Sequence, residues 1–129
     1  MRPALDGLVV LVVEDDHDSM ELVRTVLRHC GALVFAASDA AAALGILDAV
    51  QPTVLVSDIM MPGADGWWLV AEARRRGRLH DVPKVAMTSL DVHPEEVRSR
   101  GFDAYLRKPV DLDVLCATIN ALARGQSAA

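Results

Sequence analysis

Aromatic residues are scarce in this sequence: Phe, Trp and Tyr together make up only 4% of its 129 residues. Aliphatic side chains and alanine must therefore fill the core, and with 52% hydrophobic residues the chain has enough of them for one domain. Long apolar runs are missing as well. The aliphatic run 8–13 is far too short to cross a bilayer, and residues 1–7 lack the apolar centre of a signal peptide. We expect a soluble, cytoplasmic protein with no membrane partner.

Cysteine occurs only twice, at Cys30 and Cys116, and neither residue belongs to a Cys-x-x-Cys unit or a Cys/His cluster. Both lie within apolar helical patterns. We therefore interpret them as small buried hydrophobes in a reducing compartment, and we expect no disulfide between them.

Basic residues are outnumbered by acidic ones, and the formal net charge is −5. This balance argues against direct nucleic-acid binding, although it leaves a protein partner open. The arginine-rich segment 74–78 is expected to line the C-terminal end of a helix, where cations suit the helix dipole.

Five short β-type segments are present, and a helical pattern follows each of them. The predicted strands cover residues 8–13, 32–37, 53–56, 84–88 and 104–106. Alternation of this kind predicts an α/β fold, with a five-stranded parallel sheet, helices on both faces and right-handed crossovers. We assign residues 1–7 to an N-terminal tail or linker, 8–124 to the domain and 125–129 to a C-terminal tail.

Capping residues and apolar spacing predict the helices. Asp16 or Asp18 caps the first, Ser38 a second running to about residue 50, and Asp111 the last. A third helix is predicted at 67–76, and a short fourth begins at Pro94. The buried face of the first helix is expected to carry Leu22, Val23, Val26, Leu27 and Cys30, and that of the last helix Leu112, Leu115, Cys116, Ile119 and Leu122.

Polar residues follow four of the predicted strands: Glu14 and Asp15, then Asp58, Thr88 and Lys108. In open α/β sheets, ligands collect at the carboxyl ends of the strands. Several carboxylates in one pocket repel each other unless a cation joins them, and an all-oxygen ligand set favours Mg²⁺ or Mn²⁺. A lysine beside such a cation indicates a third group, an anionic phosphoryl group.

Four motifs occur in the following order: VLVVEDD, LVSDIMMPGADGWWL, AMTS and YLRKP. With these motifs the sequence resembles the receiver domains of response regulators in two-component signalling. The resemblance covers residues 8–122. It implies the flavodoxin-like and CheY-like (βα)5 fold, a doubly wound sandwich with strand order 2-1-3-4-5.

The resemblance also implies roles for individual residues. Asp58 is the phosphoacceptor, and the donor is a histidine kinase or a histidine phosphotransfer protein. Asp15 binds Mg²⁺ directly, Glu14 acts through water, and Met60 lends its backbone carbonyl. The remaining roles are a switch hydroxyl at Thr88, a switch aromatic at Tyr105 and a conserved-type lysine at Lys108, followed by a peptide bond to Pro109 that is often cis.

Such a domain is a signalling switch that catalyses only its own Mg²⁺-dependent phosphorylation and dephosphorylation. A downstream protein partner reads the surface of the last two helices and the fifth strand, and a homodimer is possible. Leu90 is expected at the rim of the pocket, where it affects access of water. Trp68 replaces the family's usual Glu and is expected to be exposed, either as an isolated aromatic or as a contact with a partner.

Two other functions are compatible with parts of the sequence. Asp16-His17-Asp18 matches the D-x-D of haloacid-dehalogenase-type phosphohydrolases, in which Asp16 would be labelled instead of Asp58. A structural receiver that takes no phosphate is the other alternative. Residues 2–16 resemble the junction between kinase and receiver in hybrid kinases, so a free-standing regulator and the receiver of a larger protein both stay open.

Overall fold

A parallel five-stranded sheet forms the centre of the computed structural model, which describes residues 4–89 and 91–125. The strands are β1 (Val9–Val13), β2 (Leu33–Ala37), β3 (Val54–Asp58), β4 (Lys84–Thr88) and β5 (Ala104–Arg107). Their order is β2-β1-β3-β4-β5, and every neighbouring pair is parallel. The predicted topology is therefore confirmed.

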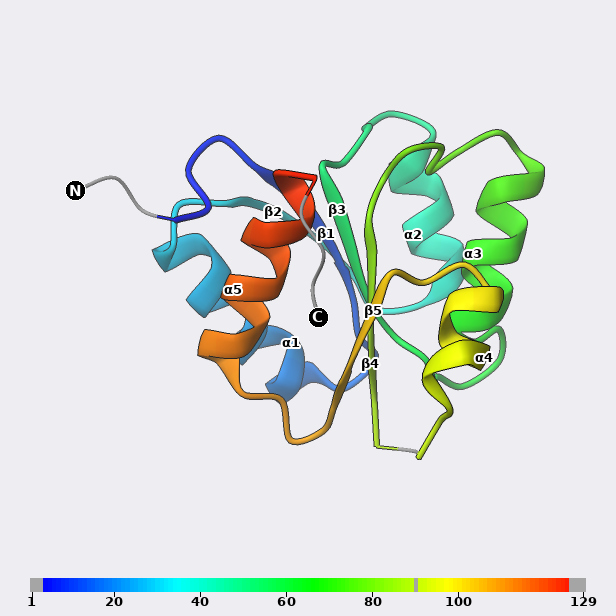
Figure 1. Cartoon of the computed structure of the whole chain (residues 1–129). Helices are drawn as coiled ribbons and strands as arrows, with labels where there is room; N and C mark the ends of the chain where they lie inside the picture. The colour runs from blue at the N-terminus through cyan, green and yellow to red at the C-terminus, as the bar shows by residue number, and fades with distance from the viewer. Residues whose placement is uncertain (1–3, 90, 126–129) are drawn as a thin grey trace.

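Helices cover both faces of this sheet, as Figure 1 shows. They are α1 (His17–His29), α2 (Ala40–Leu47), α3 (Gly66–Arg75), α4 (Pro94–Ser99) and α5 (Leu112–Ala123). α1 and α5 lie on one face, and α2, α3 and α4 lie on the other. The described part of the chain contains no helix that is long and apolar enough to span a membrane.

Two hydrophobic cores result, one on each face of the sheet. Successive residues of β1 alternate between them: Val10 and Val12 join the core under α1 and α5, whereas Leu11 and Val13 join the core under α2 and α3. A strand whose side chains point to opposite faces must be apolar throughout when both faces are covered. This burial is the physical reason for the continuous aliphatic run in the sequence.

Aspartate caps four of the five helices. Asp16, Asp39, Asp65 and Asp111 each accept a hydrogen bond from a backbone amide in the first turn. Asp16 is thus the cap of α1. The prediction of Ser38 for α2 is wrong, because the Asp39 carboxylate reaches the amide of Ala42 at 2.7 Å. α2 also ends at Leu47, earlier than predicted.

The buried face of α1 differs from the predicted one. Met20, Val23 and Leu27 face the core, whereas Leu22 is 57% exposed, so its assignment to the buried face is wrong. Val26 and Cys30 are partly buried against the same core, so the apolar stripe is shifted away from Leu22 and toward Met20. In α5 the prediction is better: Leu115, Cys116 and Ile119 are buried, and Leu112 and Leu122 are partly buried against them.

Packing begins before the first strand. Leu5 lies among the residues that we assigned to a tail, yet it is completely buried. Its amide donates to the carbonyl of Cys30 at 2.9 Å, which joins this segment to the end of α1.

The two cysteines are brought together by the fold. Cys30 is the C-cap of α1, and Cys116 lies in α5, 86 residues further along. Their Sγ atoms are 3.4 Å apart, and both thiols are free. Nothing in the sequence pattern indicated this contact.

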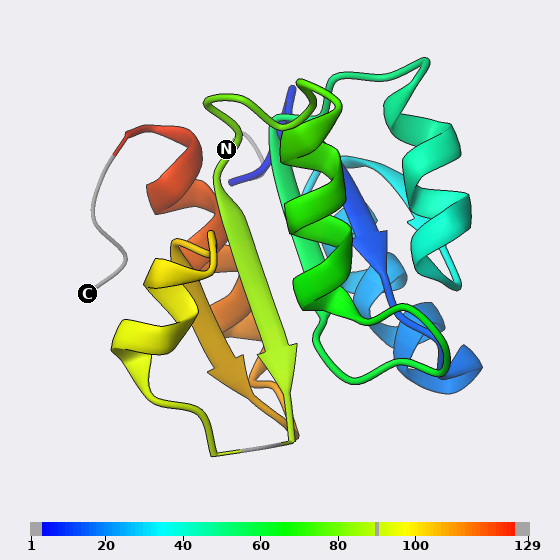
Figure 2. The same cartoon turned by 90° about the vertical axis from the view of Figure 1, so that its right-hand side faces the viewer.

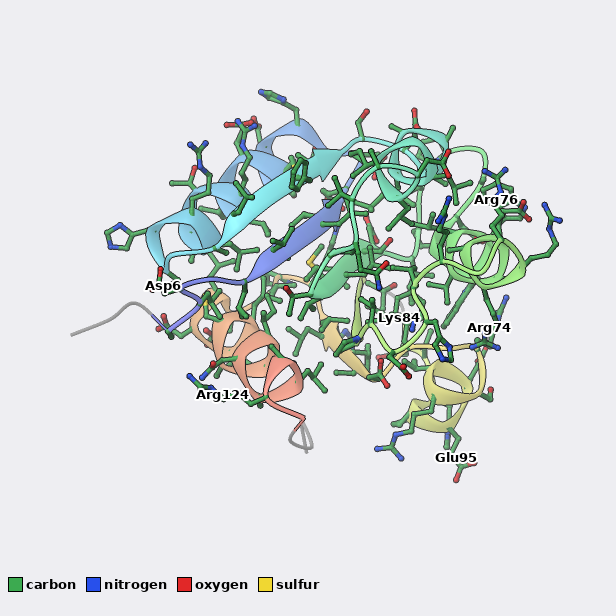
Figure 3. All side chains as sticks on the ribbon, turned by 90° about the horizontal axis from the view of Figure 1, so that it is seen from above. Asp6, Arg74, Arg76, Lys84, Glu95 and Arg124 are labelled. Atoms are coloured by element: carbon green, nitrogen blue, oxygen red, sulfur yellow. The ribbon has the colours of Figure 1, made fainter. Side chains whose placement is uncertain are left out.

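The arginine-rich segment forms no single basic face. Glu72 accepts hydrogen bonds from Arg75 and Arg76, and Figure 3 shows Arg74 and Arg76 projecting from opposite sides of α3. The adjacent tryptophans diverge as expected: Trp67 packs edge-on against Phe102 and under Arg100, whereas Trp68 is 43% exposed.

Gly66 allows α3 to begin directly beside the end of β3. Its amide donates to the carbonyl of Ile59 at 2.9 Å, and an added Cβ would lie 2.4 Å from the carbonyl oxygen of Asp58. The atoms nearest to this added Cβ all belong to the main chain, so no flexible side chain can move aside for it. The glycine therefore fixes the position of the Asp58 main chain.

We predict opposite effects of alanine at two helical glycines. Gly66→Ala lowers the free energy of unfolding by about 2 kcal/mol or more, because the methyl group meets main-chain atoms. Gly45→Ala, the control, raises it by about 0.5–1 kcal/mol, because Gly45 is exposed in α2 with nothing near the new methyl. Urea unfolding measures both, and equal effects would contradict the close approach at Gly66.

Candidate functional site

The carboxyl ends of the strands lie along one edge of the sheet, at the bottom of Figure 2. Glu14 follows β1, Asp58 ends β3, Thr88 ends β4 and Lys108 follows β5. These residues come from separate parts of the chain, and parallel strands place them at one edge. The grouping expected from the sequence is present.

Lys108 joins two acidic residues at this edge. Its ammonium Nζ lies 2.8 Å from Asp58 Oδ2 and 2.8 Å from Glu14 Oε1. Partial burial opposes the charge on Lys108, but its hydrogen bonds to Asp58 and Glu14 outweigh that effect and raise the pKa of the lysine. The residue is therefore a fixed positive charge between two carboxyl groups.

The Glu14 side chain is completely buried. Burial, reinforced by the neighbouring Asp58, raises the pKa of Glu14 to about 7, although Lys108 acts in the opposite direction. Its second oxygen, Oε2, has no hydrogen-bond partner within the described residues. A buried carboxylate oxygen of this kind requires either a proton or a cation.

Hydrogen bonds from neighbouring residues hold Asp58 in place. The residue is only 4% exposed, and its Oδ1 accepts a hydrogen bond from the amide of Met60 at 3.1 Å. Its own carbonyl accepts from the Ser57 hydroxyl at 2.9 Å. Both carboxylate oxygens of Asp58 therefore have a partner, one the Met60 amide and the other Lys108.

Glu14, Asp15 and Asp58 form an acidic cluster. One oxygen from each side chain can be chosen so that the three lie within 4.8 Å of one another. Two of these residues are buried, and Asp15 is exposed at the mouth of the cluster. A small divalent cation with oxygen ligands fits this donor set, and it would also satisfy Glu14 Oε2. The cluster can hold a metal ion.

The structure describes three further predicted site residues, Thr88, Tyr105 and Met60. Thr88 is buried, and its carbonyl accepts a hydrogen bond from the amide of Lys108 at 2.8 Å. The peptide bond between Lys108 and Pro109 is cis, as the resemblance implied. Tyr105 is half-buried and packs against the core under α2, α3 and α4. Met60 is exposed, and Leu90 falls outside the described residues.

The D-x-D segment does not resemble a nucleophile site. Asp16 is exposed, and its Oδ2 accepts from the amide of Ser19 at 2.8 Å as the cap of α1. Hydrogen bonds from Ser19 lower the pKa of Asp16. Asp16 therefore has the features of a helix cap, which disfavours the hydrolase alternative.

A cavity of about 480 Å³ opens beside Lys108, between α1 and the segment that leads into α5. Most of its lining is apolar, and it includes Glu14, Ser19, Leu22, Val23, Met87, Ser89, Lys108, Pro109, Val110 and Leu112. Sequence reasoning missed this groove, because it placed Leu22 on the buried face of the helix.

Known proteins are similar to this chain in sequence and in fold. The sequence model of the response regulator receiver domain matches residues 10–120. The response regulator MprA of Mycobacterium avium is 37% identical over 117 residues, 89% of this chain and 50% of MprA, so the chain spans about half the length of that relative.

The receiver domain of the Francisella response regulator 1452 matches with a TM-score of 0.83 at 28% identity, covering 92% of this chain and 98% of that one. The chemotaxis response regulator CheY4 of Vibrio cholerae matches with a TM-score of 0.79 at 26% identity, covering 87% and 95%. The chain belongs to the family of response regulator receiver domains.

Proposed function

We propose that this receiver domain accepts a phosphoryl group on Asp58 from a histidine kinase or a histidine phosphotransfer protein. The observation that carries the proposal is the position of Lys108 Nζ, 2.8 Å from Asp58 Oδ2 at the edge of an acidic cluster. A carboxylate beside a fixed ammonium group and a cation site is equipped to become an acyl phosphate.

In the transfer, a carboxylate oxygen of Asp58 attacks the phosphorus of a phosphohistidine in line. An oxygen–phosphorus bond forms, and the phosphorus–nitrogen bond breaks, its electrons returning to the imidazole. The Lys108 ammonium is positioned to neutralise charge on the transferred group, and the Met60 amide holds Asp58 in place. The domain thereby acts as a switch that catalyses only its own phosphorylation and dephosphorylation.

Mg²⁺ is the proposed cofactor, and Mn²⁺ also suits the oxygen ligands. Asp15 and Asp58 would bind it, with the backbone carbonyl of Met60 and with Glu14 acting through water. When bound, the ion offsets negative charge on the acidic cluster and on the phosphoryl oxygens. The buried Glu14 Oε2, which lacks a partner within the described residues, supports this assignment.

Thr88 and Tyr105 are the proposed switch residues. The Thr88 hydroxyl turns toward the new phosphoryl group, and the half-buried Tyr105 moves further into the space that this releases. The surface of α4, β5 and α5 then changes. An exposed ion pair between Arg107 and Asp91 joins β5 to the segment before α4 on this surface. A downstream protein partner, or a second copy of the chain, would read the change.

The groove beside Lys108 is the proposed docking site for the phosphodonor. Its volume is about 480 Å³, its lining is mainly apolar, and Leu22 extends that apolar lining onto the surface with 57% of its area exposed. A helix of a donor protein that presents its histidine to Asp58 would bury these residues.

Substitution of the phosphoacceptor tests the central assignment. We expect Asp58→Asn to abolish Mg²⁺-dependent labelling by radioactive acetyl phosphate, because an amide cannot form an acyl phosphate. Asp16→Asn is the matched control and should label normally, since asparagine also caps helices. Loss of label in Asp16→Asn with retention in Asp58→Asn would instead support the hydrolase.

Protonation of Glu14 gives a second prediction. Without metal, burial raises its pKa to about 7 in the folded protein, from the ordinary glutamate value of 4.5. Folding therefore favours the protonated form, and the Glu14 contribution to stability is complete below pH 4.5 and is lost as the pH rises through 7. This loss amounts to about 3 kcal/mol at most.

Urea unfolding between pH 5 and 8 measures the effect, with Glu14→Gln as the control. The variant should lose most of this decrease with pH, because its amide does not titrate. Mg²⁺ should stabilise the wild type more at pH 8 than at pH 6, since the ion prefers ionised ligands. An unchanged pH slope in Glu14→Gln would contradict the raised pKa.

The docking groove gives a third prediction. With a histidine kinase that phosphorylates the wild-type chain, Leu22→Ala should slow phosphotransfer by about tenfold, because an apolar contact is removed. Labelling by acetyl phosphate should not change. Leu33→Ala is the matched control, since Leu33 is equally exposed, at 59%, and lies on β2 outside the groove. Equal transfer rates in both variants would refute this docking site.

A further inference from the structure

The contact between the two cysteines joins elements that are far apart in the sequence. Cys30 ends α1, Cys116 lies in α5, and the two Sγ atoms are 3.4 Å apart across a separation of 86 residues. A disulfide bond is about 2.05 Å long, so each sulfur needs to move by less than about 1 Å. Rotation about the Cα–Cβ bonds of Cys30 and Cys116 can move the sulfur atoms over a distance of this size.

The two thiols differ in accessibility. Cys30 is half-buried at the end of its helix, whereas Cys116 is buried among apolar side chains of the core under α1 and α5. Burial, followed by the contact with Cys30, raises the pKa of Cys116 to about 12. Cys116 therefore keeps its proton at neutral pH, and an oxidant meets Cys30 first.

We propose that Cys30 and Cys116 are a site of reversible oxidative modification, at which a peroxide forms a disulfide bond between α1 and α5. This function is separate from phosphorylation and uses none of the residues around Asp58.

The reaction is balanced with hydrogen peroxide as the oxidant. Cys30 sulfur attacks one peroxide oxygen, the oxygen–oxygen bond breaks, and water and a sulfenic acid form. Cys116 sulfur then attacks the Cys30 sulfur, the sulfur–oxygen bond breaks, and the thiol proton leaves with hydroxide as a second water. Two thiols and one peroxide thus give one disulfide and two waters. Two equivalents of a small-molecule thiol reverse the change.

The bond would act on a specific part of the structure. α1 supplies Ser19, Leu22 and Val23 to the groove beside Lys108, and the segment entering α5 supplies Val110 and Leu112. Linking the two elements fixes the distance between the walls of this groove. An effect on donor docking rests on the proposed function, whereas formation of the bond does not.

Thiol alkylation of the full chain tests the proposal. When it is labelled after unfolding in urea, the reduced protein should take up two maleimide groups, because unfolding exposes the buried Cys116 thiol. Protein that is treated with hydrogen peroxide before unfolding should take up none, form no disulfide between chains, weigh less by two hydrogen atoms and yield a cross-linked peptide containing Cys30 and Cys116. Cys30→Ala and Cys116→Ala, the matched controls, should form no bond within the chain. A wild-type protein that keeps both thiols free, or that cross-links only between chains, would overturn the proposal.

A measurement on the wild type alone guards against variants that fold poorly. In a series of glutathione redox buffers, the native chain should form the bond under more reducing conditions than the chain unfolded in urea, because folding holds the two sulfurs in contact. By the same thermodynamic cycle, oxidation should raise the Tm. Equal bond formation in the native and unfolded chains would show that the fold does not favour the pair.

Discussion

The chemistry that we propose for this domain depends on one ammonium group shared by two buried acidic side chains. Lys108 Nζ contacts both Glu14 and Asp58 at 2.8 Å. Removing these charges from water is costly, and only their mutual contacts and further hydrogen bonds offset that cost. The arrangement is incomplete on the acidic side, where Glu14 Oε2 has no partner among the described residues. We propose that one cation completes the site and that the transferred phosphoryl group then joins it.

The parallel arrangement of the strands brings these groups together. Three parallel strands carry Glu14, Asp58 and Lys108 to the same edge. In the sequence, Asp58 is 50 positions and Glu14 is 94 positions from Lys108. Gly66 lets α3 start against the Asp58 main chain, and the amide of Lys108 is tied to the carbonyl of Thr88. In the same parallel arrangement, helices cover the sheet on both faces, which explains why β1 and the first three residues of β3 are apolar throughout.

The resemblance to receiver domains predicted the strand order. Local patterns predicted the grouping of polar residues, because four strands end where an apolar run meets an acidic or hydroxyl side chain, and β5 ends just before Lys108. Features that depend on how helices pack on the sheet were not predictable. The orientation of α1 on the sheet leaves Leu22 exposed at the groove. The packing of α1 beside α5 brings Cys30 into contact with Cys116. Neither follows from periodicity, which fixes the width of an apolar stripe but not its exact facing. Asp39 caps α2 in place of Ser38, because the helix begins one residue later than predicted.

A crystal structure of the protein treated with beryllofluoride and Mg²⁺ tests the central claim most directly. Beryllofluoride mimics a phosphoryl group bound to a carboxylate. The account predicts one such group bonded to Asp58, in contact with Lys108, and a metal ion among Glu14, Asp15 and Asp58. A group bonded to Asp16, or Asp58 left unmodified with Lys108 still bridging it to Glu14, would contradict the account.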